Sequence, residues 1–233
     1  MKQLYEGKAK IVYQGPGTDE VIIHFKDDAT AGNGAKKASI EGKGVLNNQI
    51  STLLFTYLER NGVATHLLET LNERDIRCRK VTIFPLEVIV RNRAAGSMVR
   101  RLGLARGKLF AEPTVEYSYK KDELGDPLLN DDHAVALNIA TREELAYIRE
   151  AALKVNDLLK ARFAEIGITL VDFKLEYGKA SDGTIYLVDE LSPDNMRLWD
   201  QDEVSFDKDR FREDSGDLIS GYRAIYRALK ETD

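Results

Sequence analysis

The sequence has 233 residues, of which 43% are hydrophobic and 31% are charged, and its formal net charge is −5. This is the composition of an ordinary soluble globular protein, with either one large domain or two small ones. The negative charge argues against general nucleic-acid binding, and no apolar run approaches the roughly 20 residues of a membrane span. With one cysteine, Cys78, and no signal-peptide pattern, we expect a cytoplasmic protein without disulfides or a thiolate zinc site.

The first predicted strand carries two lysines on one side. Residues 4–13 read L-Y-E-G-K-A-K-I-V-Y, with Gly7 in the middle and Lys8 and Lys10 alternating on one face. After a G-P-G turn, a second strand follows over 21–25. A glycine-interrupted hairpin of this kind is suited to cover nucleotide phosphates, where lysine acts as a point charge. Ordinary surface lysines are the alternative, and this stretch alone does not decide between them.

A polar stretch and a helix come next. Residues 27–44 are rich in Asp, Gly, Ala and Lys, and they include T-A-G-N-G-A-K-K at 30–37. Such a composition predicts either a flexible connector or a lid that closes over substrate. An apolar stripe then predicts a helix over 45–61, which ends at Gly62.

Two short strands are expected over 67–71 and 76–81. Pro85, which follows Ile83 and Phe84, suits a hinge between two lobes because proline fixes the backbone and cannot donate a hydrogen bond. We therefore expect the chain to pass from one lobe to the other near this point.

The strand P-L-E-V-I-V-R-N-R at 85–93 leads into a predicted anion site. A short helix begins near Gly96 and Ser97, so backbone N–H groups and the helix dipole would point at an anion. Arg91 could add bidentate contacts to a phosphate. The alternative is a surface patch on an amphipathic helix, which is how we interpret the remaining arginines, Arg100, Arg101 and Arg106.

The middle of the chain is mostly scaffold. A strand is expected over 115–119, and the polar loop after it contains Lys120 and Asp126, which either reach a substrate or belong to plain surface. A capping box and an apolar stripe predict a long helix over 141–166. A final helix over 218–229 is expected to pack on a sheet.

The most informative stretch is a predicted hairpin over 170–193. Asp182-Gly183 is typical of a two-residue type I′ loop, and counting outward from it puts Glu176 directly across from Asp189. Opposed residues share a face, so the two carboxylates would project together. Two carboxylates with room for water suit Mg²⁺, which prefers few protein oxygens plus substrate phosphates.

Asp172 and Lys174 extend the same polar face, while the residues between them point the other way. The alternative is the solvated side of an ordinary hairpin. Two features weigh against it: the acids oppose each other instead of pairing with Lys or Arg across the strands, and both strands are apolar enough to be central. No acyl-enzyme motif, Walker A sequence or histidine metal spacing is present. The residues alone therefore indicate a Mg²⁺–nucleotide enzyme with a second phosphate site.

Several blocks, in order along nearly the whole chain, resemble the phosphoribosylaminoimidazole-succinocarboxamide synthase (SAICAR synthetase) family of de novo purine synthesis. They are L-Y-E-G-K-A-K at 4–10, T-A-G-N-G-A at 30–35, V-R-N-R-A-A-G-S at 90–97, L-V-D-F-K-L-E-Y-G at 170–178, D-E-L-S-P-D at 189–194 and R-L-W-D at 197–200. The chain has Asn33 where many members carry Asp, Tyr177 where many carry Phe, and Leu191 where Phe is frequent.

The resemblance implies a two-lobed α/β (α+β) fold with ATP in the cleft. The expected lobes are an antiparallel nucleotide-covering lobe at 1–83 and a larger catalytic and substrate-binding lobe at 84–233. It also implies ATP, Mg²⁺, L-aspartate and a carboxyaminoimidazole ribonucleotide as ligands, and a homodimer. Members activate the imidazole carboxylate, through an acyl phosphate in our interpretation, and the aspartate amine then displaces phosphate to form an amide.

The resemblance also assigns residues. It implies that the nucleotide contacts are Lys8, Lys10, Ile83, Glu176 and Asp189. Glu176 and Asp189 would also hold Mg²⁺. The ribonucleotide phosphate would be gripped by Arg91, Ser97 and Arg197, and Lys120 and Asp126 would line the substrate side. Lys174 would lie near the reacting carboxylate and, with Asp189, would be catalytic.

Two other functions are weighed against the ligase. A small-molecule kinase would use the same nucleotide lobe, but no H-R-D-type catalytic loop and no D-F-G motif is present. A nucleotide-binding regulatory module is the non-enzymatic alternative, favoured only by the lack of a recognisable general base. ADP formation that depends on an amine separates the ligase from the kinase, and turnover with Mg²⁺ excludes the module.

Overall fold

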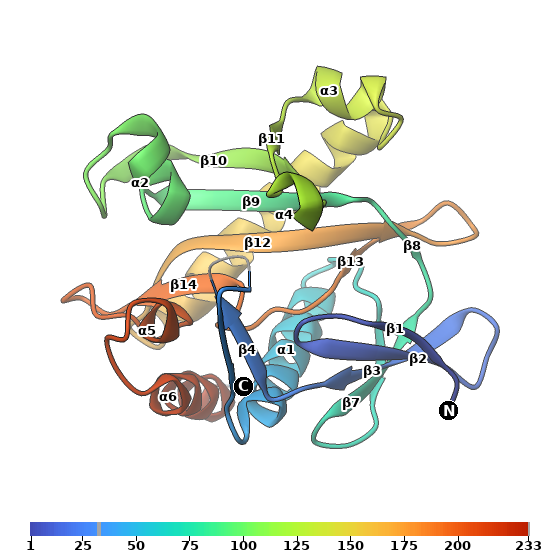
Figure 1. Cartoon of the computed structure of the whole chain (residues 1–233), viewed down its shortest axis with the longest axis horizontal. Coiled ribbons are helices and arrows are strands. Elements are labelled where there is room, and N and C mark those ends of the chain that lie inside the picture. Colours follow the sequence, from blue (N-terminus) through green and yellow to red (C-terminus); the bar gives the residue numbers. More distant parts are fainter. Residues whose placement is uncertain (32–33, 233) are drawn as a thin grey trace.

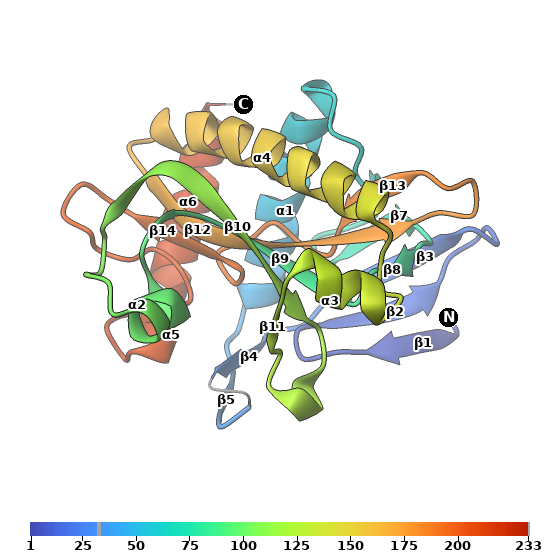
Figure 2. The same ribbon diagram turned by 90° about the horizontal axis from the view of Figure 1, so that it is seen from above.

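The computed structural model describes residues 1–31 and 34–232. Gly32, Asn33 and Asp233 lie outside the described residues. The predicted connector or lid over 27–44 is centred on the T-A-G-N-G-A loop, so the centre of that prediction also lies outside the described residues. The described chain is a mixed α/β structure with two larger sheets and one small hairpin (Figure 1). Figure 2, seen from above, shows helices lying across one side of these sheets.

The first sheet has five antiparallel strands in the order β1–β2–β3–β7–β6. They are β1 Gln3–Glu6, β2 Lys10–Gln14, β3 Glu20–Phe25, β7 Asp75–Arg79 and β6 Leu67–Thr70. Alternation along β3 turns Val21, Ile23 and Phe25 to one buried face. Helix α1, Lys43–Arg60, contacts β3 and supplies apolar side chains to the same core.

One expectation for the N-terminal stretch is wrong. Residues 4–13 do not form one strand, because the Gly7 amide donates to the Lys10 carbonyl at 2.8 Å and the chain turns there between β1 and β2. Lys8 consequently lies in the turn, whereas Lys10 begins β2. The two lysines therefore do not alternate along one strand face.

The second sheet runs β11–β10–β9–β12–β13, and β14 and β8 also pair with β12. Its strands are β8 Thr82–Ile83, β9 Leu86–Arg93, β10 Leu109–Tyr119, β11 Leu128–Leu129, β12 Thr169–Lys179, β13 Ile185–Val188 and β14 Met196–Trp199. On β12, the alternating Phe173, Leu175 and Tyr177 belong to the apolar core that also contains residues of α4, Arg142–Ala164. The predicted capping box of α4 is confirmed, with Thr141 and Glu144 bonded reciprocally.

The remaining elements show where local pattern was insufficient. Residues expected to form a polar loop contain a hairpin of β4 Asp28–Ala31 and β5 Lys36–Ser39. The other short elements are α2 Gly96–Leu102, a 3₁₀ turn Asp122–Leu124, α3 Asp131–Ala136 and α5 Asp209–Arg212. The last helix, α6 Leu218–Glu231, packs against α1 where we expected a sheet.

The predicted register of the acidic hairpin is also wrong. Glu176 pairs with Val188, and Tyr177 pairs with Leu187, so β12 and β13 are shifted by one residue from the expected pairing. The loop is longer than two residues, because the Ala180 amide donates to the Thr184 carbonyl at 2.9 Å. A type I′ turn needs positive φ at both central residues, but only Gly183 has it.

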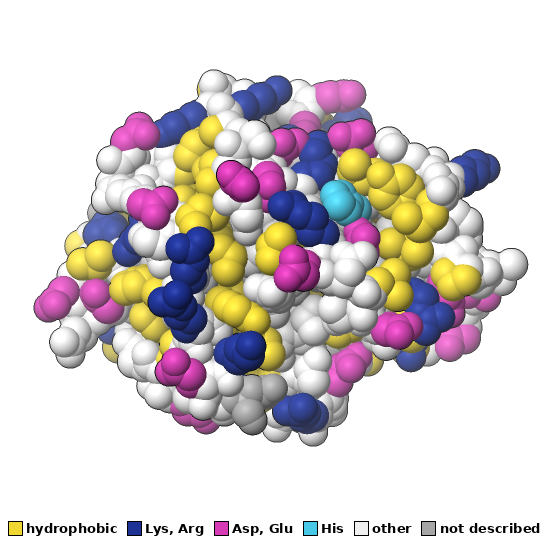
Figure 3. All heavy atoms as spheres, turned by 90° about the horizontal axis from the view of Figure 1, so that it is seen from below, with side chains coloured by type: hydrophobic (Ala, Val, Ile, Leu, Met, Phe, Trp, Pro, Cys, Tyr) yellow, Lys and Arg dark blue, Asp and Glu magenta, His cyan; other side chains and the backbone are white. Residues whose placement is uncertain are grey.

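The two sheets share one apolar core, and residues 64–66 run beside β13. The chain enters the second sheet at β8, which pairs with β12. In the described ranges no helix combines the length and apolar character needed to cross a membrane. Figure 3 shows one face on which Lys and Arg side chains are interspersed with Asp and Glu side chains.

Candidate active site

A cavity of about 430 Å³ is lined on one side by the β1–β2 turn and the β4–β5 hairpin. Its other side is formed by β9, β12, β14 and α5. The cationic side chains that line it are Lys8, Arg91, Lys174, Arg197, Lys208 and Arg212. Four acids of the described residues, Glu87, Asp172, Glu190 and Asp194, line it as well. The excess of positive over negative side chains, in a protein of net charge −5, indicates a site for anionic ligands.

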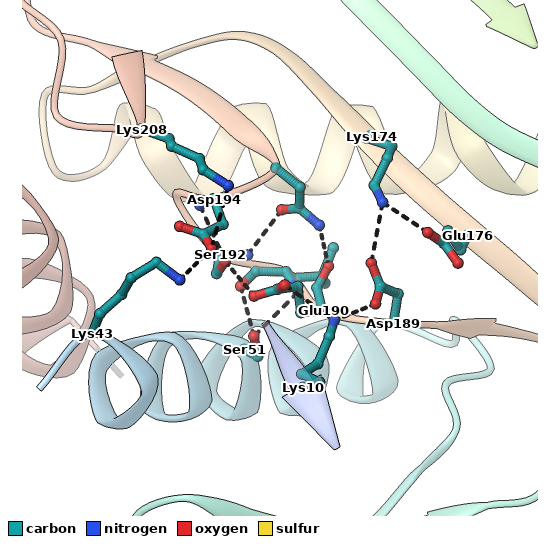
Figure 4. Close-up of polar contacts among 12 residues, drawn as sticks. Lys10, Lys43, Ser51, Lys174, Glu176, Asp189, Glu190, Ser192, Asp194 and Lys208 are labelled. Carbon is teal, nitrogen blue, oxygen red and sulfur yellow. Dashed lines mark hydrogen bonds and ion pairs between the residues drawn. The ribbon is translucent and has the colours of Figure 1, made fainter. Parts of the chain in front are cut away.

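A group that we call the lysine–acid cluster adjoins one end of the cavity through Lys174 and Glu190, which line it. Its members are Lys10, Lys120, Lys174, Glu176, Asp189 and Glu190. Lys174 Nζ lies 2.7 Å from Glu176 Oε1 and 3.4 Å from Asp189 Oδ2 (Figure 4). Lys10 contacts Asp189 and lies 3.0 Å from Glu190 Oε1. Each carboxylate of the cluster therefore has a lysine partner.

Asp189 reaches this cluster from an unusual backbone position. It follows the end of β13 and has a φ of 68°, in the left-handed region that non-glycine residues seldom adopt. Glu176 and Asp189 are not cross-strand partners, yet they meet at the same lysine nitrogen. The left-handed turn at Asp189 therefore brings the two carboxylates together, which we had expected strand register to do.

Asp189 and Lys174 of this cluster are both ionised at neutral pH. Burial by itself would raise the pKa of Asp189, but Lys10 and Lys174 outweigh it and hold that pKa well below its usual range. Burial opposes the charge of Lys174 in the same way, yet Asp189 and Glu176 raise its pKa well above the ordinary value. Nearby His66 is only 3% exposed, and burial lowers its pKa to about 3, so it is neutral.

The other end of the cavity is built from a row of alternating charges, which we call the arginine–acid row. Its members, in order, are Arg101, Glu116, Arg91, Asp172, Arg197, Asp209 and Arg212. Arg91 Nε lies 2.8 Å from Glu116 Oε2, and Arg91 also contacts Asp172. Arg197 Nη1 lies 2.9 Å from Asp172 Oδ2. The row therefore continues unbroken from one sheet strand to the next.

Sheet pairing explains the row. Strands β10, β9, β12 and β14 are neighbours, and Asp172 pairs in register with Arg91 on one side and Arg197 on the other. The expectation that the acids of this face lack cross-strand cations is therefore wrong for Asp172. Directly opposed opposite charges stabilise a sheet, and arginine forks add geometric specificity.

The predicted anion-site residues come together here. Arg91 Nη2 donates to Ser97 Oγ at 3.3 Å. A Cβ placed on Gly96, whose φ is 54°, would lie 2.5 Å from Arg197 Nη2, so a side chain there would displace this guanidinium. Arg91, Ser97 and Arg197 are thus adjacent, although they come from three different elements.

The remaining predicted site residues differ in how they lie relative to the cavity. Lys8 lines the cavity and pairs with Asp122 at 2.8 Å, and Lys120 Nζ lies 2.5 Å from Glu176 Oε2. Ile83 is 41% exposed in β8, and Asp126 accepts from the Lys121 amide at 2.8 Å. Within the described ranges, neither Ile83 nor Asp126 lines this cavity, and their predicted roles stay predictions.

Sequence reasoning missed two cations. Lys208 and Arg212 both line the cavity, four residues apart at the start and end of one helical turn. Burial lowers the pKa of Lys208, and the carboxylate of Asp194, 3.8 Å away, opposes that shift. Asp194 also pairs with the fully buried Lys43 at 2.5 Å. The i, i+4 spacing of two cations was the available signal.

Comparisons with known proteins agree with one another. The family model described as SAICAR synthetase matches residues 3–229. A phosphoribosylaminoimidazole-succinocarboxamide synthase of Finegoldia magna is 55% identical over 231 residues, which are 99% of this chain and 100% of the relative. A crystal structure of the enzyme of that name from Ehrlichia chaffeensis has a TM-score of 0.96 and 43% identity, covering 98% of each chain. A SAICAR synthetase in complex with ADP has a TM-score of 0.94 and 49% identity, covering 97% of this chain and 96% of the other.

Proposed function

This chain belongs to the SAICAR synthetase family and is an ATP-dependent ligase of purine biosynthesis, and we propose how its cavity performs the reaction. The ligase joins L-aspartate to the carboxylate of the carboxyaminoimidazole ribonucleotide, giving SAICAR, ADP and phosphate. The alternative expectation of a kinase is not favoured by these matches. What remains to be proposed is the role of each residue.

One observation carries the proposal: a single strand, β12, connects the arginine–acid row to the lysine–acid cluster and lines the cavity with Asp172 and Lys174. Asp172, Lys174 and Glu176 alternate along the polar face of β12, so neighbours on this face are about 7 Å apart. Asp172 belongs to the arginine–acid row and Glu176 to the lysine–acid cluster. Lys174 lies between them. A substrate that spans this distance would have its phosphate at one end and its reacting carboxylate near Lys174.

The nucleotide is assigned to the lysine–acid cluster. Lys8 and Lys10 would contact the ATP phosphates, where lysine acts as a point charge. Ile83 on β8 would lie beside the nucleotide. The division of the chain into lobes at 1–83 and 84–233 is also part of this proposal. A relative with 49% identity is in complex with ADP, which supports the use of a nucleotide by this chain.

Mg²⁺ would be held by Glu176 and Asp189. The donor chemistry fits, because Lys174 Nζ already lies within 3.4 Å of both carboxylates, so the site accommodates a cation between them. When bound, the ion would supply positive charge that offsets the negative charge of the transferring phosphoryl group. Within the described ranges, no three acids, histidines or cysteines are grouped as a metal site, so the proposed protein ligands are these two carboxylates alone.

The ribonucleotide phosphate is assigned to Arg91, Ser97 and Arg197, which are adjacent in the structure. Lys120 and Asp126 keep their predicted place on the substrate side. Two cations of the cavity are then left for the carboxylates of L-aspartate, namely Lys208 and Arg212. Three anionic ligands thus meet three separate groups of cations.

The chemistry follows from the substrates. A carboxylate is a poor electrophile, so it must acquire a leaving group before an amine can attack it. We expect a carboxylate oxygen of the imidazole to attack the γ-phosphorus of ATP, forming an acyl phosphate as the bond to ADP breaks. The neutral amine of L-aspartate then attacks the acyl carbon, phosphate departs with the bonding electrons, and the amine releases a proton to solvent. Lys10 and Lys174 would stabilise the charge that develops on the transferring phosphoryl group.

Assembly and location complete the proposal. A homodimer is supported by the resemblance, and light scattering on the purified protein tests it. A cytoplasmic location is supported by Cys78, which is buried and, as the single cysteine, unable to form an internal disulfide.

The experiment that tests the proposed function is phosphate release from ATP and Mg²⁺, with ribonucleotide and L-aspartate added separately and together. Release only with both, together with an amide product, is the expected result. Release with the ribonucleotide alone would also support an acyl phosphate that leaks to water. Phosphate release without amide formation when the ribonucleotide and L-aspartate are both present would contradict the ligase.

A further inference from the structure

Asp209 stands between two arginines that line the cavity. Its Oδ2 accepts from Arg197 Nε at 2.7 Å, and its Oδ1 accepts from Arg212 Nη1 at 2.6 Å. The side chain of Asp209 is only 6% exposed. Arg197 and Arg212 line the cavity, whereas Asp209 is not among the described residues that line it. The carboxylate therefore contacts both cations from behind the binding surface.

The position of Asp209 is itself fixed from two sides. Its amide donates to Asp207 Oδ1 at 2.8 Å, and Asp207 Oδ2 accepts from the Leu198 amide at 2.8 Å. Leu198 lies next to Arg197 on β14. Asp207 is fully buried, so it ties the start of α5 to the strand that carries Arg197. Both oxygens of Asp209 consequently have a fixed direction.

The two arginines serve different ligands in the function proposed above, on which this inference rests. We propose that Asp209 is a positioning residue that orients both substrate-binding arginines, Arg197 toward the ribonucleotide phosphate and Arg212 toward a carboxylate of the amino acid. A planar guanidinium binds an oxyanion well only when its fork faces it, so the direction of each arginine matters as much as its charge. One carboxylate thus sets the geometry of two substrate sites.

The charge of Asp209 is suited to this role. Burial would raise its pKa, but Arg197 and Arg212 outweigh it and lower that pKa, so the carboxylate stays ionised. Removing the charge would take away the contact that holds both guanidiniums from this side, and would leave Asp172 as the acid that still contacts Arg197. Amide formation requires both substrates in a reactive arrangement, and small misplacements are costly. The nucleotide end, at the lysine–acid cluster, does not share these contacts.

The test is Asp209→Asn in the full-length protein, with KM measured for each substrate while the others are saturating. We expect KM for the ribonucleotide and for L-aspartate each to rise roughly tenfold, and KM for ATP to change by less than about twofold. A purely structural role would lower kcat with all three KM values unchanged, and that result overturns the proposal. Asp217→Asn is the matched control, because this exposed acid only caps α6 and asparagine caps equally well.

A second variant isolates the link between the two arginines. Arg212→Gln should raise KM for L-aspartate alone. In that background, Asp209→Asn should still raise KM for the ribonucleotide but have little further effect on KM for L-aspartate. If the two changes are simply additive for L-aspartate, Asp209 does not act through Arg212 and the inference is wrong.

Two further outcomes are distinguishable. If Asp209→Asn does not fold, Asp209→Glu keeps the charge one methylene further out, and a smaller rise in the same two KM values is expected; a rise in neither, or in only one, contradicts the inference. If wild type forms no amide when ATP, Mg²⁺, the ribonucleotide and L-aspartate are all present, the proposed function fails instead. A wild type that behaves as a ligase, with only one KM shifted in Asp209→Asn, refutes this inference alone.

Discussion

The two ends of the cavity hold charge in different ways. In the lysine–acid cluster, long lysine side chains gather around acids carried by a strand and by the chain just beyond β13. In the arginine–acid row, guanidiniums and carboxylates on neighbouring strands face each other in register. Lysines are flexible point charges and can move aside for another cation, whereas arginine forks bound on two edges are fixed in direction.

The difference fits the ligands proposed for each end. A nucleotide with a metal ion requires acids that can exchange a lysine for Mg²⁺ and phosphate, so adaptable partners are suitable. A phosphate monoester requires donors already aimed at it, because preorganised donors need no rearrangement on binding. The variants below test this contrast, from the largest expected effect to the smallest.

The largest effect is expected from Asp189→Asn. Removing this charge should lower kcat by roughly 10³-fold, because the carboxylate is proposed to hold the metal ion where charge develops on the phosphoryl group. The fold should survive, which circular dichroism and thermal unfolding check. Asp182→Asn, on the exposed loop of the same hairpin, is the control because asparagine can also accept from the Thr184 amide. Near-normal turnover in Asp189→Asn would remove the metal role.

Arg91 tests the fixed character of the other end. Arg91→Lys keeps the charge but loses the fork, and we expect KM for the ribonucleotide to rise roughly 100-fold while KM for ATP is unchanged. Arg91→Ala should likewise raise KM for the ribonucleotide and leave KM for ATP unchanged. It should also destabilise the fold by roughly 3–5 kcal/mol, because it leaves Asp172 and Glu116 without this partner. Arg100→Ala, exposed on α2, is the control. An equal loss of both affinities in Arg91→Lys would contradict the division into two ends.

Lys208 gives a smaller, pH-dependent effect. Lys208→Met should raise KM for L-aspartate roughly tenfold, as expected when one cation of a carboxylate site is removed. Because burial lowers the pKa of Lys208, the wild-type lysine loses its charge at a lower pH than an exposed lysine would. KM for L-aspartate should therefore rise as the pH increases through this lowered pKa, and the rise should be absent in Lys208→Arg. A profile that is the same in both proteins would argue against this assignment.

The last effect concerns the stability of the fold near the end of the row, where we expect no change in turnover. Burial, and then the charge of Asp209, raises the pKa of Asp207 to about 6. The folded state therefore binds more protons than the unfolded state between about pH 4 and pH 6, so this residue's contribution to stability falls as the pH rises through that window. The shift corresponds to roughly 3 kcal/mol at most. Urea unfolding from pH 4.5 to 7 should show this loss in wild type but not in Asp207→Asn, and parallel curves would contradict it.

Much of the fold could be predicted because it depends on local patterns. The stripe and capping box of α4, the strand β9 and the polar alternation of β12 were all readable from neighbouring residues. The β4–β5 hairpin was not, since its residues are polar and its pairing depends on the rest of the fold. Lys208 and Arg212 were missed because only the fold brings the short helix α5 to the cavity.

The candidate site divides in the same way. The sequence by itself determined which residue types lie on each face of a strand, because side chains alternate with a fixed period. Only the tertiary structure decided the register of β12 and β13, the left-handed turn at Asp189 and the row of charges from Arg101 to Arg212. These depend on loop geometry and on strand order between residues far apart in the chain, such as Arg91 and Asp172, and a local period carries no information about either.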